Sequence, residues 1–495
     1  MTRRMYSLGM MLGIGVIFTP APALTQTLAA PATTAVTERS LTPYTHCYID
    51  NYSGPVQCAH LTVPIDWGTP SGDSIALKVM RLPSLSLTPL DPVLLLAGGP
   101  GQAGAKLGGL IRPAFAKLLR TREIIVIDQR GTGGSHPLPC DINEPLALDP
   151  DAYQAAMVPQ VKACADSLDI DPEFFGSLSA VHDIDALRAA LGREKINLWG
   201  GSYGTRLALL YAAEFPDHAR SLILDSVTPP SLPIHLTKAQ SQDRAFQLLL
   251  SDCAASPRCK TAYGDLGTAY DTLLTSIGTD GLQVSLPHPT TGEMTEITIT
   301  RELISGAVFS GLYRPERRQH LPAILKKASL GEFAPLLAFS LWLNGGSADD
   351  LQFGLMLSVF CAEDVPHATA DAVRAASENT ISGAGDYPLW RAMCSVWPVT
   401  PKPYHDPENA PPTLLLSGNL DPVTPPSSAA HVAAKIDVFR HIIVPHSGHI
   451  TSMIGCVPDL IGEFLETLDP AALDPACLDS ITPLPFVILP EGEAP

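Results

Sequence analysis

Short apolar runs alternate with stretches of helical periodicity in two parts of the chain, from about residue 60 to 230 and again from residue 411. Each run is only a few residues long and ends near a glycine-rich or polar turn. The runs are Val93–Leu96, Ile124–Ile127, Ile196–Trp199, Leu222–Leu224, Leu414–Leu416 and His441–Val444. Such runs predict buried strands, and their alternation with helices predicts an α/β fold with a mostly parallel central sheet.

The region between these two parts has a mainly helical periodicity instead. The expected helices are Gln242–Leu250, Arg301–Leu312 and His320–Ser329, and a short strand-like stretch lies near Leu282–Ile299. Prolines cluster at both ends of the region, from Pro229 to Pro233 and from Pro398 to Pro403. We therefore expect an inserted helical cap, which would restrict access to a site beneath it and favour small substrates or chain ends.

The amino terminus has the pattern of an export signal. Arg3 and Arg4 are followed by the apolar run Leu8–Phe18 and the small-residue cleavage site Ala21–Ala23. That run is too short for a transmembrane span, and no later stretch is long enough. The expected segments are a signal peptide (1–23), a flexible leader (24–40), the first part of the core (41–235), the cap (236–400) and the C-terminal part of the core (401–495).

Cysteine usage agrees with an exported protein, either periplasmic or secreted. All ten cysteines follow the signal, an even number that suits an oxidising compartment. Proximity in the sequence suggests the pairs Cys47–Cys58, Cys140–Cys164, Cys253–Cys259, Cys361–Cys394 and Cys456–Cys477. Metal binding is the competing use, but no C-x-x-C or H-E-x-x-H spacing occurs, so we expect neither a metal nor a cofactor.

The formal net charge is −18, from 50 acidic and 32 basic residues. Binding to a phosphate backbone requires basic partners, so this charge argues against a nucleic-acid function.

The motif G-x-S-x-G at Gly200–Gly204 lies between the expected strand Ile196–Trp199 and the expected helix Thr205–Phe215. A sharp turn between a strand and a helix is the setting of a nucleophile elbow, which projects a serine hydroxyl from a strained backbone. Glycines two residues before and after the serine leave room where side chains would collide. Ser202 is therefore the candidate nucleophile.

A serine hydroxyl needs a base to accept its proton and an acid to orient that base. Asp421 and His449 each follow an expected strand, and they come after the serine in the order Ser, Asp, His. These two residues are the candidate acid and base. Two alternatives stay open: Asp225 could serve as the acid, and His446 could replace His449.

The turn Gly98–Gly101 follows the expected strand Val93–Leu96 and could present backbone N–H groups to a developing oxyanion. The amides of Gly99 and Tyr203 are the candidate donors. A phosphate-binding loop is disfavoured because no G-K-[ST] follows the turn. The polar loop Asp128–Ser135 could brace this turn, with Asp128 and Arg130 in structural roles.

With these motifs in place, the chain resembles the proline iminopeptidase and tripeptidyl aminopeptidase family of α/β-hydrolases. The matching pieces are Gly98–Gly101, Asp128–Gly131, Gly200–Gly204, Asp421-Pro422 and Gly448-His449. The segment Asp421–Pro425 resembles the tripeptidyl aminopeptidase branch. One departure is Ala97, where the family often has histidine before the two glycines; the backbone donors survive that change. The resemblance implies an α/β-hydrolase fold and a serine peptidase acting at free amino termini of peptides.

An enzyme that acts at amino termini needs a carboxylate to bind the ammonium group. Family members resembling this chain carry an acid near a cysteine of the cap, and Glu363 followed by Asp364 stands close to Cys361 here. The resemblance thus makes Glu363 and Asp364 the candidate amine-binding acids. The alternative is a pair of solvated acids at a helix end.

Taken together, the chain is expected to be an exported serine aminopeptidase that needs no metal. A carboxylesterase with the same triad is the first alternative, in which the cap would bind an acyl chain. A non-catalytic binding module on a hydrolase fold is the second, and the presence of all catalytic parts in order disfavours it.

Overall fold

A nine-stranded sheet runs through the residues described by the computed structural model, which are 41–140, 142, 150–288, 291–344 and 351–489. The expected signal peptide and leader lie outside these residues. The strands occur in the order β1-β2-β3-β5-β4-β6-β7-β10-β11, and those from β5 to β11 are all parallel. Their bounds are Thr45–Ile49 (β1), Tyr52–Pro64 (β2), Ser74–Leu82 (β3), Leu90–Leu96 (β4), Arg122–Ile127 (β5), Ile196–Gly201 (β6), Ala219–Asp225 (β7), Thr413–Gly418 (β10) and Phe439–Val444 (β11).

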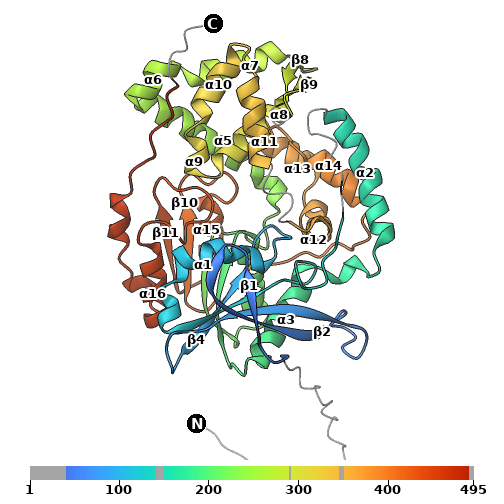
Figure 1. Ribbon diagram of the computed structural model, residues 1–495, viewed down its shortest axis with the longest axis vertical. Helices are drawn as coiled ribbons and strands as arrows, with labels where there is room; N and C mark the ends of the chain where they lie inside the picture. The colour runs from blue at the N-terminus through green and yellow to red at the C-terminus, as the bar shows by residue number, and fades with distance from the viewer. Residues whose placement is uncertain (1–40, 141, 143–149, 289–290, 345–350, 490–495) are drawn as a thin grey trace, which may run out of the picture. The chain divides into compact units, whose positions relative to one another are not determined.

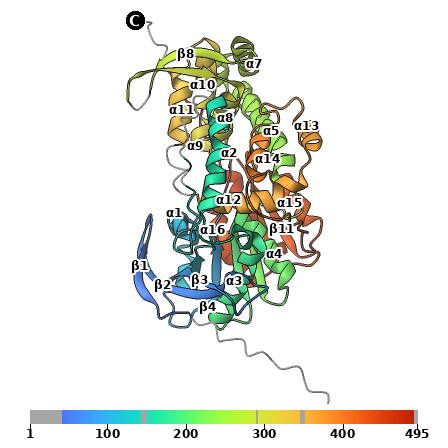
Figure 2. The same ribbon diagram turned by 90° about the vertical axis from the view of Figure 1, so that its right-hand side faces the viewer.

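The first three strands pair antiparallel and form one edge of the sheet, where β1 and β2 lie in Figure 2. The six buried apolar runs expected from the sequence all lie within the parallel strands β4, β5, β6, β7, β10 and β11. The expected mostly parallel sheet is therefore confirmed.

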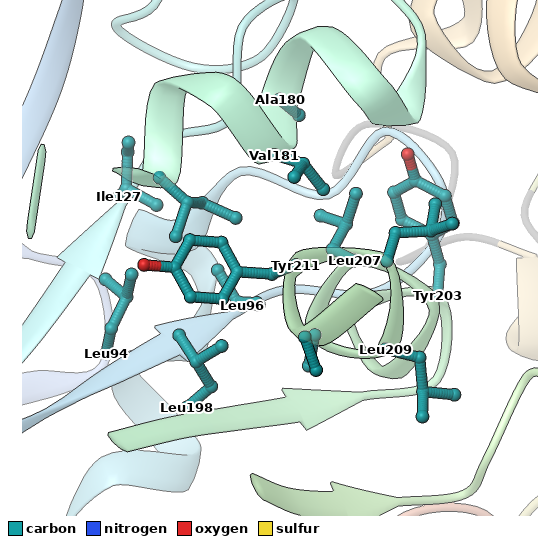
Figure 3. Packing of buried hydrophobic residues seen from close by; sticks show 14 of the residues in the cluster. Leu94, Leu96, Ile127, Ala180, Val181, Leu198, Tyr203, Leu207, Leu209 and Tyr211 are labelled. Atoms are coloured by element: carbon teal, nitrogen blue, oxygen red, sulfur yellow. The ribbon is translucent and has the colours of Figure 1, made fainter. Parts of the chain in front are cut away.

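Helices cover both faces of the parallel strands. Alternate residues of β4 point to opposite sides: Leu94 and Leu96 pack with α3 (Ser177–Ala190), α4 (Tyr203–Glu214) and α15 (Pro426–Ala433). Figure 3 shows this cluster. Val93 and Leu95 pack on the other side, against α1 (Gly108–Phe115) and α16 (Val457–Thr467). Burial on both faces explains why these strands are continuously apolar in the sequence and do not alternate.

The chain between β7 and β10 forms an insertion, which we call the cap. Its helices are α5 (Ile234–Ala255), α6 (Pro257–Tyr263), α7 (Leu266–Ile277), α8 (Arg301–Leu312), α9 (Pro315–Arg318), α10 (Leu321–Ser329), α11 (Ala334–Asn344), α12 (Phe353–Val359), α13 (Ala370–Ser377) and α14 (Tyr387–Cys394). A two-stranded sheet of β8 (Leu282–Pro287) and β9 (Met294–Ile299) accompanies them. The three helices and the strand-like stretch expected in this region are present, whereas the segment boundaries stay a prediction.

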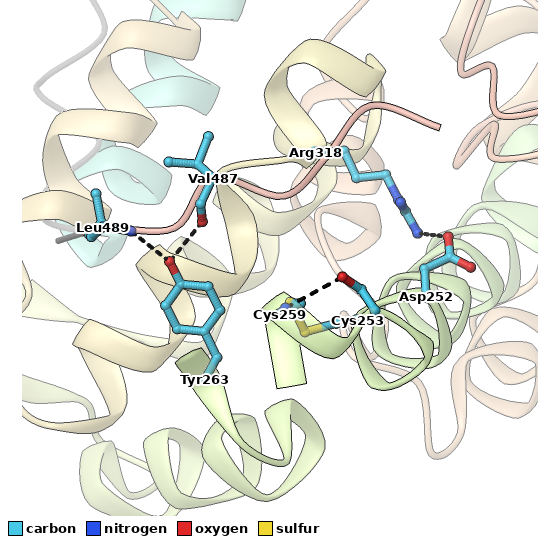
Figure 4. The surroundings of a disulfide bond; sticks show 8 residues. Asp252, Cys253, Cys259, Tyr263, Arg318, Val487 and Leu489 are labelled. Carbon is cyan, nitrogen blue, oxygen red and sulfur yellow. Dashed lines mark hydrogen bonds and ion pairs between the residues drawn. A yellow bond between two sulfur atoms is a disulfide. The ribbon is translucent and has the colours of Figure 1, made fainter. Parts of the chain in front are cut away.

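The last described residues of the chain, up to Leu489, lie on the cap. Figure 1 shows this segment running from α16 towards α6. The Tyr263 hydroxyl donates to the carbonyl of Val487 at 2.7 Å and accepts from the N–H of Leu489 at 3.2 Å, as Figure 4 shows. Phe486 and Ile488 pack against the apolar cluster of the cap. The described residues after α16 are thus joined to the inserted helices.

All ten cysteines are among the described residues, and they form the five disulfides expected from the sequence. Each links residues close in the chain, with separations from 6 to 33. Five disulfides are typical of proteins that fold outside a reducing cytosol. Over the part of the chain that the structure describes, no helix has both the length and the apolar character needed to cross a membrane.

Arg130, in the loop after β5, is fully buried and joins three elements that precede the elbow. Its guanidinium makes a bidentate ion pair with Asp183 of α3, at 2.7 and 2.6 Å. It also donates to the carbonyls of Ile65 at 2.8 Å and Phe174 at 2.9 Å. This matches the structural role expected for Arg130.

Replacing Arg130 by alanine should lower the free energy of unfolding by about 3–5 kcal/mol, because Asp183 would be left buried without its cation. Urea unfolding followed by fluorescence measures this. Lys162→Ala is the matched control, since Lys162 and Asp166 form an exposed ion pair at 2.9 Å and its loss should cost at most about 1 kcal/mol. Similar losses in the two variants would contradict this role.

Candidate active site

Ser202 connects β6 to α4 in a backbone conformation that non-glycine residues rarely adopt, with φ 55° and ψ −122°. Its N–H donates to the carbonyl of Asp225 at 2.9 Å, on the neighbouring strand. A Cβ at Gly200 would lie 2.3 Å from the carbonyl oxygen of Gly204, and one at Gly204 would lie 2.2 Å from that of Leu96. The two glycines therefore permit the close packing that the turn requires. The helix begins directly after the serine, two residues earlier than expected, because the turn itself starts it.

Asp421 follows β10 and is fully buried. Its Oδ1 accepts the N–H groups of Val423 at 2.8 Å and Thr424 at 2.9 Å, and its Oδ2 accepts the Thr424 hydroxyl at 2.9 Å. His449 Nδ1 lies 2.8 Å from the same Oδ2. Burial works to raise the pKa of Asp421, but the nearby imidazole and these hydrogen bonds outweigh it and bring the pKa to about 2. The carboxyl is thus ionised and can fix the tautomer of His449.

His449 follows β11, and the end of α8 holds the loop that carries it. The N–H of His449 donates to the carbonyl of Tyr313 at 3.0 Å, and the two rings meet edge to face at 4.8 Å. A Cβ at Gly448 would lie 2.4 Å from that carbonyl oxygen, so only glycine allows this approach. A residue of the cap therefore shapes the position of the histidine.

The alternative acid, Asp225, and the alternative base, His446, do not form the pair that Asp421 and His449 form. Asp225 is buried and accepts hydrogen bonds from the backbone and hydroxyl groups of Thr451 and Ser452, at 2.6 to 3.0 Å. It therefore anchors the residues after His449. Among the interactions of the described residues, Asp421 pairs with His449 and not with His446.

The glycine-rich turn after β4 lies against the serine. A Cβ at Gly98 would be 3.1 Å from the Cβ and 3.7 Å from the Oγ of Ser202. Gly99 has φ 108°, a conformation that favours glycine. Tyr203 is the first residue of α4, so its N–H has no acceptor within the helix. The structure thus brings the turn that holds Gly99, the amide of Tyr203 and the serine to one place.

Asp128 accepts the N–H of Ala105, four residues after the turn, at 2.8 Å, and that of Gly134 in its own loop at 2.9 Å, so it holds the segment that follows the turn. On the cap side, the N–H of Gln352 donates to the carbonyl of Gly101 at 2.9 Å.

The acids expected to bind an amine, Glu363 and Asp364, lie in a short π-helical segment, Phe360–Asp364, and are buried. Asp364 forms a bidentate ion pair with Arg206 of α4, at 2.7 and 3.0 Å. Burial works to raise the pKa of Asp364, but this guanidinium outweighs it and holds the pKa below the usual value. Both oxygens of Asp364 are thus bonded to protein donors.

Glu363 lies in a different electrostatic setting. Its oxygens accept the N–H of Ser177 at 2.7 Å and the Ser177 hydroxyl at 2.6 Å, while Arg206 is 3.6 Å away. The Ser177 hydroxyl is also 2.8 Å from that of Tyr203. Burial raises the pKa of Glu363 to about 7, since its more distant cation compensates only in part. The amine-binding role of both acids stays a prediction.

Arg206, Thr424 and Tyr313 were not singled out from the sequence. Arg206 carried a usable signal, because it is the one charge inside an otherwise apolar helical stretch, Thr205–Ala213. Tyr313 carried none, since its contacts with His449 join distant segments, and the local bonds of Thr424 to Asp421 correspond to no motif in the sequence. Among the residues that the structure describes, no cluster of three or more histidine, cysteine, aspartate or glutamate side chains could hold a metal ion.

Two family models match the chain in separate segments. Residues 91–259 match the model described as the alpha/beta hydrolase fold, and residues 381–477 match that of a TAP-like protein. Serine protease Hip1 of Mycobacterium tuberculosis is 27% identical over 426 residues, covering 77% of this chain and 79% of that protein. Tripeptidyl aminopeptidase of Streptomyces lividans is 25% identical over 470 residues, covering 88% and 86%. Carboxylesterase B of Mycobacterium tuberculosis is 28% identical over 424 residues, covering 77% and 78%.

Replacing Glu363 by glutamine should change how stability depends on pH. A carboxyl whose pKa is higher in the folded than in the unfolded protein favours folding when protonated. That contribution is full below about pH 4.3, the ordinary glutamate value, and is lost as pH rises through 7. Between pH 5 and 8, wild type should therefore lose roughly 1–3 kcal/mol relative to Glu363→Gln.

Urea unfolding of both proteins at pH 5 and pH 8 measures this difference. Glu296→Gln is the control, because Glu296 is an exposed residue of β9 and its removal should leave the pH dependence of wild type. Parallel stability profiles for wild type and Glu363→Gln would contradict the raised pKa.

Proposed function

This chain belongs to the α/β-hydrolase family, with a TAP-like C-terminal segment, and is a serine hydrolase; from that premise we propose that it is a serine exopeptidase. It would hydrolyse single residues or short peptides from the free amino termini of peptide substrates. The observation that carries the proposal is the arrangement at the carboxyl ends of three parallel strands. Ser202 follows β6 in a strained turn, and Asp421 and His449 follow β10 and β11 as a hydrogen-bonded pair 2.8 Å apart.

In the proposed reaction, the Oγ of Ser202 attacks the scissile carbonyl carbon and its proton passes to Nε2 of His449. Asp421, ionised and hydrogen bonded to Nδ1, orients the imidazole and stabilises its charged form. The amides of Gly99 and Tyr203 donate to the oxygen that becomes negative. His449 then protonates the leaving amine, and an acyl-enzyme remains on Ser202.

A water molecule completes the cycle. His449 removes a proton from the water, which attacks the acyl carbon, and the ester bond to Ser202 breaks as the Oγ regains its proton. The products are the released amino-terminal fragment with a new carboxylate and the shortened peptide. Every step uses groups of this chain and water.

Two kinds of observation support a peptidase. The relatives named serine protease and tripeptidyl aminopeptidase align with about four-fifths of the chain or more. In addition, the cap contacts the proposed machinery on two sides, through Tyr313 at His449 and through Gln352 at Gly101. An insertion so close to Ser202 limits the size of the substrates that can reach this serine. It therefore favours the ends of peptide chains as substrates.

A carboxylesterase is the second candidate function. The relative named carboxylesterase B favours it, and the proposed triad would serve ester hydrolysis equally well. Export from the cytosol, to the periplasm or beyond, is also part of the proposal. The five disulfides and the signal-like pattern at residues 1–23 support it.

Replacing Ser202 by alanine should reduce turnover to background, by roughly 10⁴-fold or more, because no nucleophile remains. The purified variant should keep the thermal unfolding curve of wild type, because alanine retains the Cβ that lies against Gly98 and leaves the backbone conformation of the turn unchanged. Labelling by a fluorophosphonate should occur in wild type and be absent in the variant. Retained labelling, or unchanged rates in the pure variant, would refute the assignment.

Acetylation of the substrate separates the two candidate functions. For peptide amides with free amino termini, kcat/KM should fall about tenfold or more on N-acetylation, because the ammonium group would no longer be recognised. The comparison is made on matched pairs that differ only in the acetyl group. Equal rates would remove the exopeptidase proposal, and cleavage of simple esters alone would favour the carboxylesterase.

A further inference from the structure

Two consecutive acids of the cap hold the first turn of α4, directly after Ser202. Asp364 forms its bidentate ion pair with Arg206 of this turn, at 2.7 and 3.0 Å. Glu363 reaches the same turn indirectly, through Ser177 at the start of α3. Both acids lie in a short π-helical segment, and such irregular turns are frequent at functional sites. The insertion is thus bonded to the helix turn that starts at the proposed nucleophile.

Glu363 supplies the capping group that α3 lacks in its own sequence. The residue before this helix is Gly176, which has no side chain to accept a helix N–H. The carboxyl group of Glu363 accepts the N–H of Ser177 at 2.7 Å, and it also bonds the Ser177 hydroxyl at 2.6 Å. A negative charge at a helix N-terminus is favoured by the helix dipole. Ser177 is therefore fixed by an acid 186 positions away in the chain.

A chain of hydroxyl groups leads from Glu363 to Tyr203, whose amide is a proposed oxyanion donor. The Tyr203 hydroxyl is 2.8 Å from that of Ser177, and Nε2 of Gln129 donates to it at 3.3 Å. Figure 3 shows this hydroxyl pointing away from the strands. Burial raises the pKa of the Tyr203 phenol, so the hydroxyl keeps its proton. The side chain next to Ser202 is thus held at its far end.

The direction of the hydrogen bonds in this chain depends on whether Glu363 is ionised. An ionised carboxylate accepts the Ser177 proton, so the Ser177 oxygen can accept the proton of Tyr203 and each hydroxyl proton has an acceptor. A protonated carboxyl donates to Ser177, and Ser177 must then donate to Tyr203. The Tyr203 oxygen also accepts from Gln129, so its own proton is left without an acceptor among the described residues. An unpaired donor in a buried place is costly, so the ionised state holds Tyr203 more firmly.

We propose that Glu363 is a positioning residue for the oxyanion hole and that it acts through Ser177 and Tyr203. In its ionised state it completes the hydrogen-bond chain and fixes the first turn of α4, so that the Tyr203 amide meets the substrate oxygen that becomes negative. The inference rests on the proposed catalytic residues, but it holds for a peptide and for an ester substrate. It gives Glu363 a task other than the amine binding expected from the sequence, since both its oxygens are already bonded.

The charge of Glu363 is the variable part of this arrangement. The charged and titratable groups that face it are Arg206 and Tyr203 from α4, Tyr404 from the segment before β10, and its neighbour Asp364. Burial works to raise the pKa of Asp364, but Arg206 outweighs it and keeps the pKa below the usual value. Burial also raises the pKa of both phenols. These four groups therefore keep their charge between pH 5 and 8, whereas Glu363, with a pKa of about 7, changes its own.

The test measures kcat and KM of full-length proteins on 4-nitrophenyl acetate and on a peptide 4-nitroanilide with a free amino terminus, of which only the second carries an ammonium group. Fluorophosphonate labelling sets the active-site concentrations. At pH 8, Glu363→Gln should lower kcat on both substrates about tenfold and leave KM within about twofold, because an oxyanion donor acts on the transition state. Glu173→Gln is the matched control and should keep the wild-type kcat. Glu173 accepts the N–H and the hydroxyl of Thr400, each at 2.7 Å, and has no part in the chain to Tyr203.

Two readouts separate positioning from a general loss of structure. The ratio of kcat between wild type and Glu363→Gln cancels the pH dependence that both proteins share. This ratio should be near one at pH 5, where Glu363 is protonated and resembles glutamine, and should reach about tenfold at pH 8. Tyr203→Phe should lower kcat as well. Adding Glu363→Gln to Tyr203→Phe should cause no further loss, because the hydroxyl that the chain holds is already absent.

The other outcomes separate a failure of the function from a failure of the inference. If wild type is no more active than Ser202→Ala, the proposed catalytic residues are wrong and the inference falls with them. If wild type is active and Glu363→Gln keeps its kcat at pH 8, the positioning role is overturned. A loss confined to the peptide with a free amino terminus would overturn it too and would favour amine binding by Glu363. A ratio that is constant between pH 5 and 8, or equal losses with and without the Tyr203 hydroxyl, would leave Glu363 with a structural role only.

Discussion

The site depends on one local constraint, the backbone of Ser202 at positive φ. Such a conformation costs on the order of 1–3 kcal/mol and persists only where the surroundings impose it. Here the surroundings act from three sides. The N–H of Ser202 is fixed to the strand at Asp225, its carbonyl accepts the Thr205 hydroxyl at 2.6 Å, and Gly98 packs against its side chain. These contacts thus hold the hydroxyl of Ser202 at the edge of the sheet.

Asp225 connects this constraint to the rest of the proposed triad. Its backbone carbonyl holds Ser202, and its carboxylate holds Thr451 and Ser452, directly after the loop that carries His449. A residue at the end of one strand therefore fixes the serine and the histidine segment relative to each other. Asp225 is the alternative acid that the sequence allows, and in the structure its carboxylate bonds Thr451 and Ser452.

The sequence predicts those features that are encoded by residues close together in the chain. The strands, the elbow, the loop positions of Asp421 and His449 and the five disulfides are encoded by patterns within about 35 residues. The surroundings of Glu363 and Asp364 are not encoded by any such local pattern. Asp364 meets Arg206 across 158 positions and Glu363 meets Ser177 across 186, so their burial and opposite pKa shifts depend on how the cap folds back onto α4. No periodicity or motif contains that information.

The contacts of Glu363 and Asp364 also indicate what the cap does beyond limiting access. Arg206 stands one turn after Ser202 on α4, and its ion pair with Asp364 is buried where no solvent screens it. Breaking such a pair leaves an uncompensated charge, which is far more costly than losing an exposed one. The segment Phe360–Asp364 is further held by the Cys361–Cys394 disulfide. Together with Tyr313 at His449, these contacts make the cap part of the framework that positions the serine and the histidine. Rigid separation of cap and core would therefore disrupt the site itself, so substrates must enter around the cap and not beneath a freely opening lid.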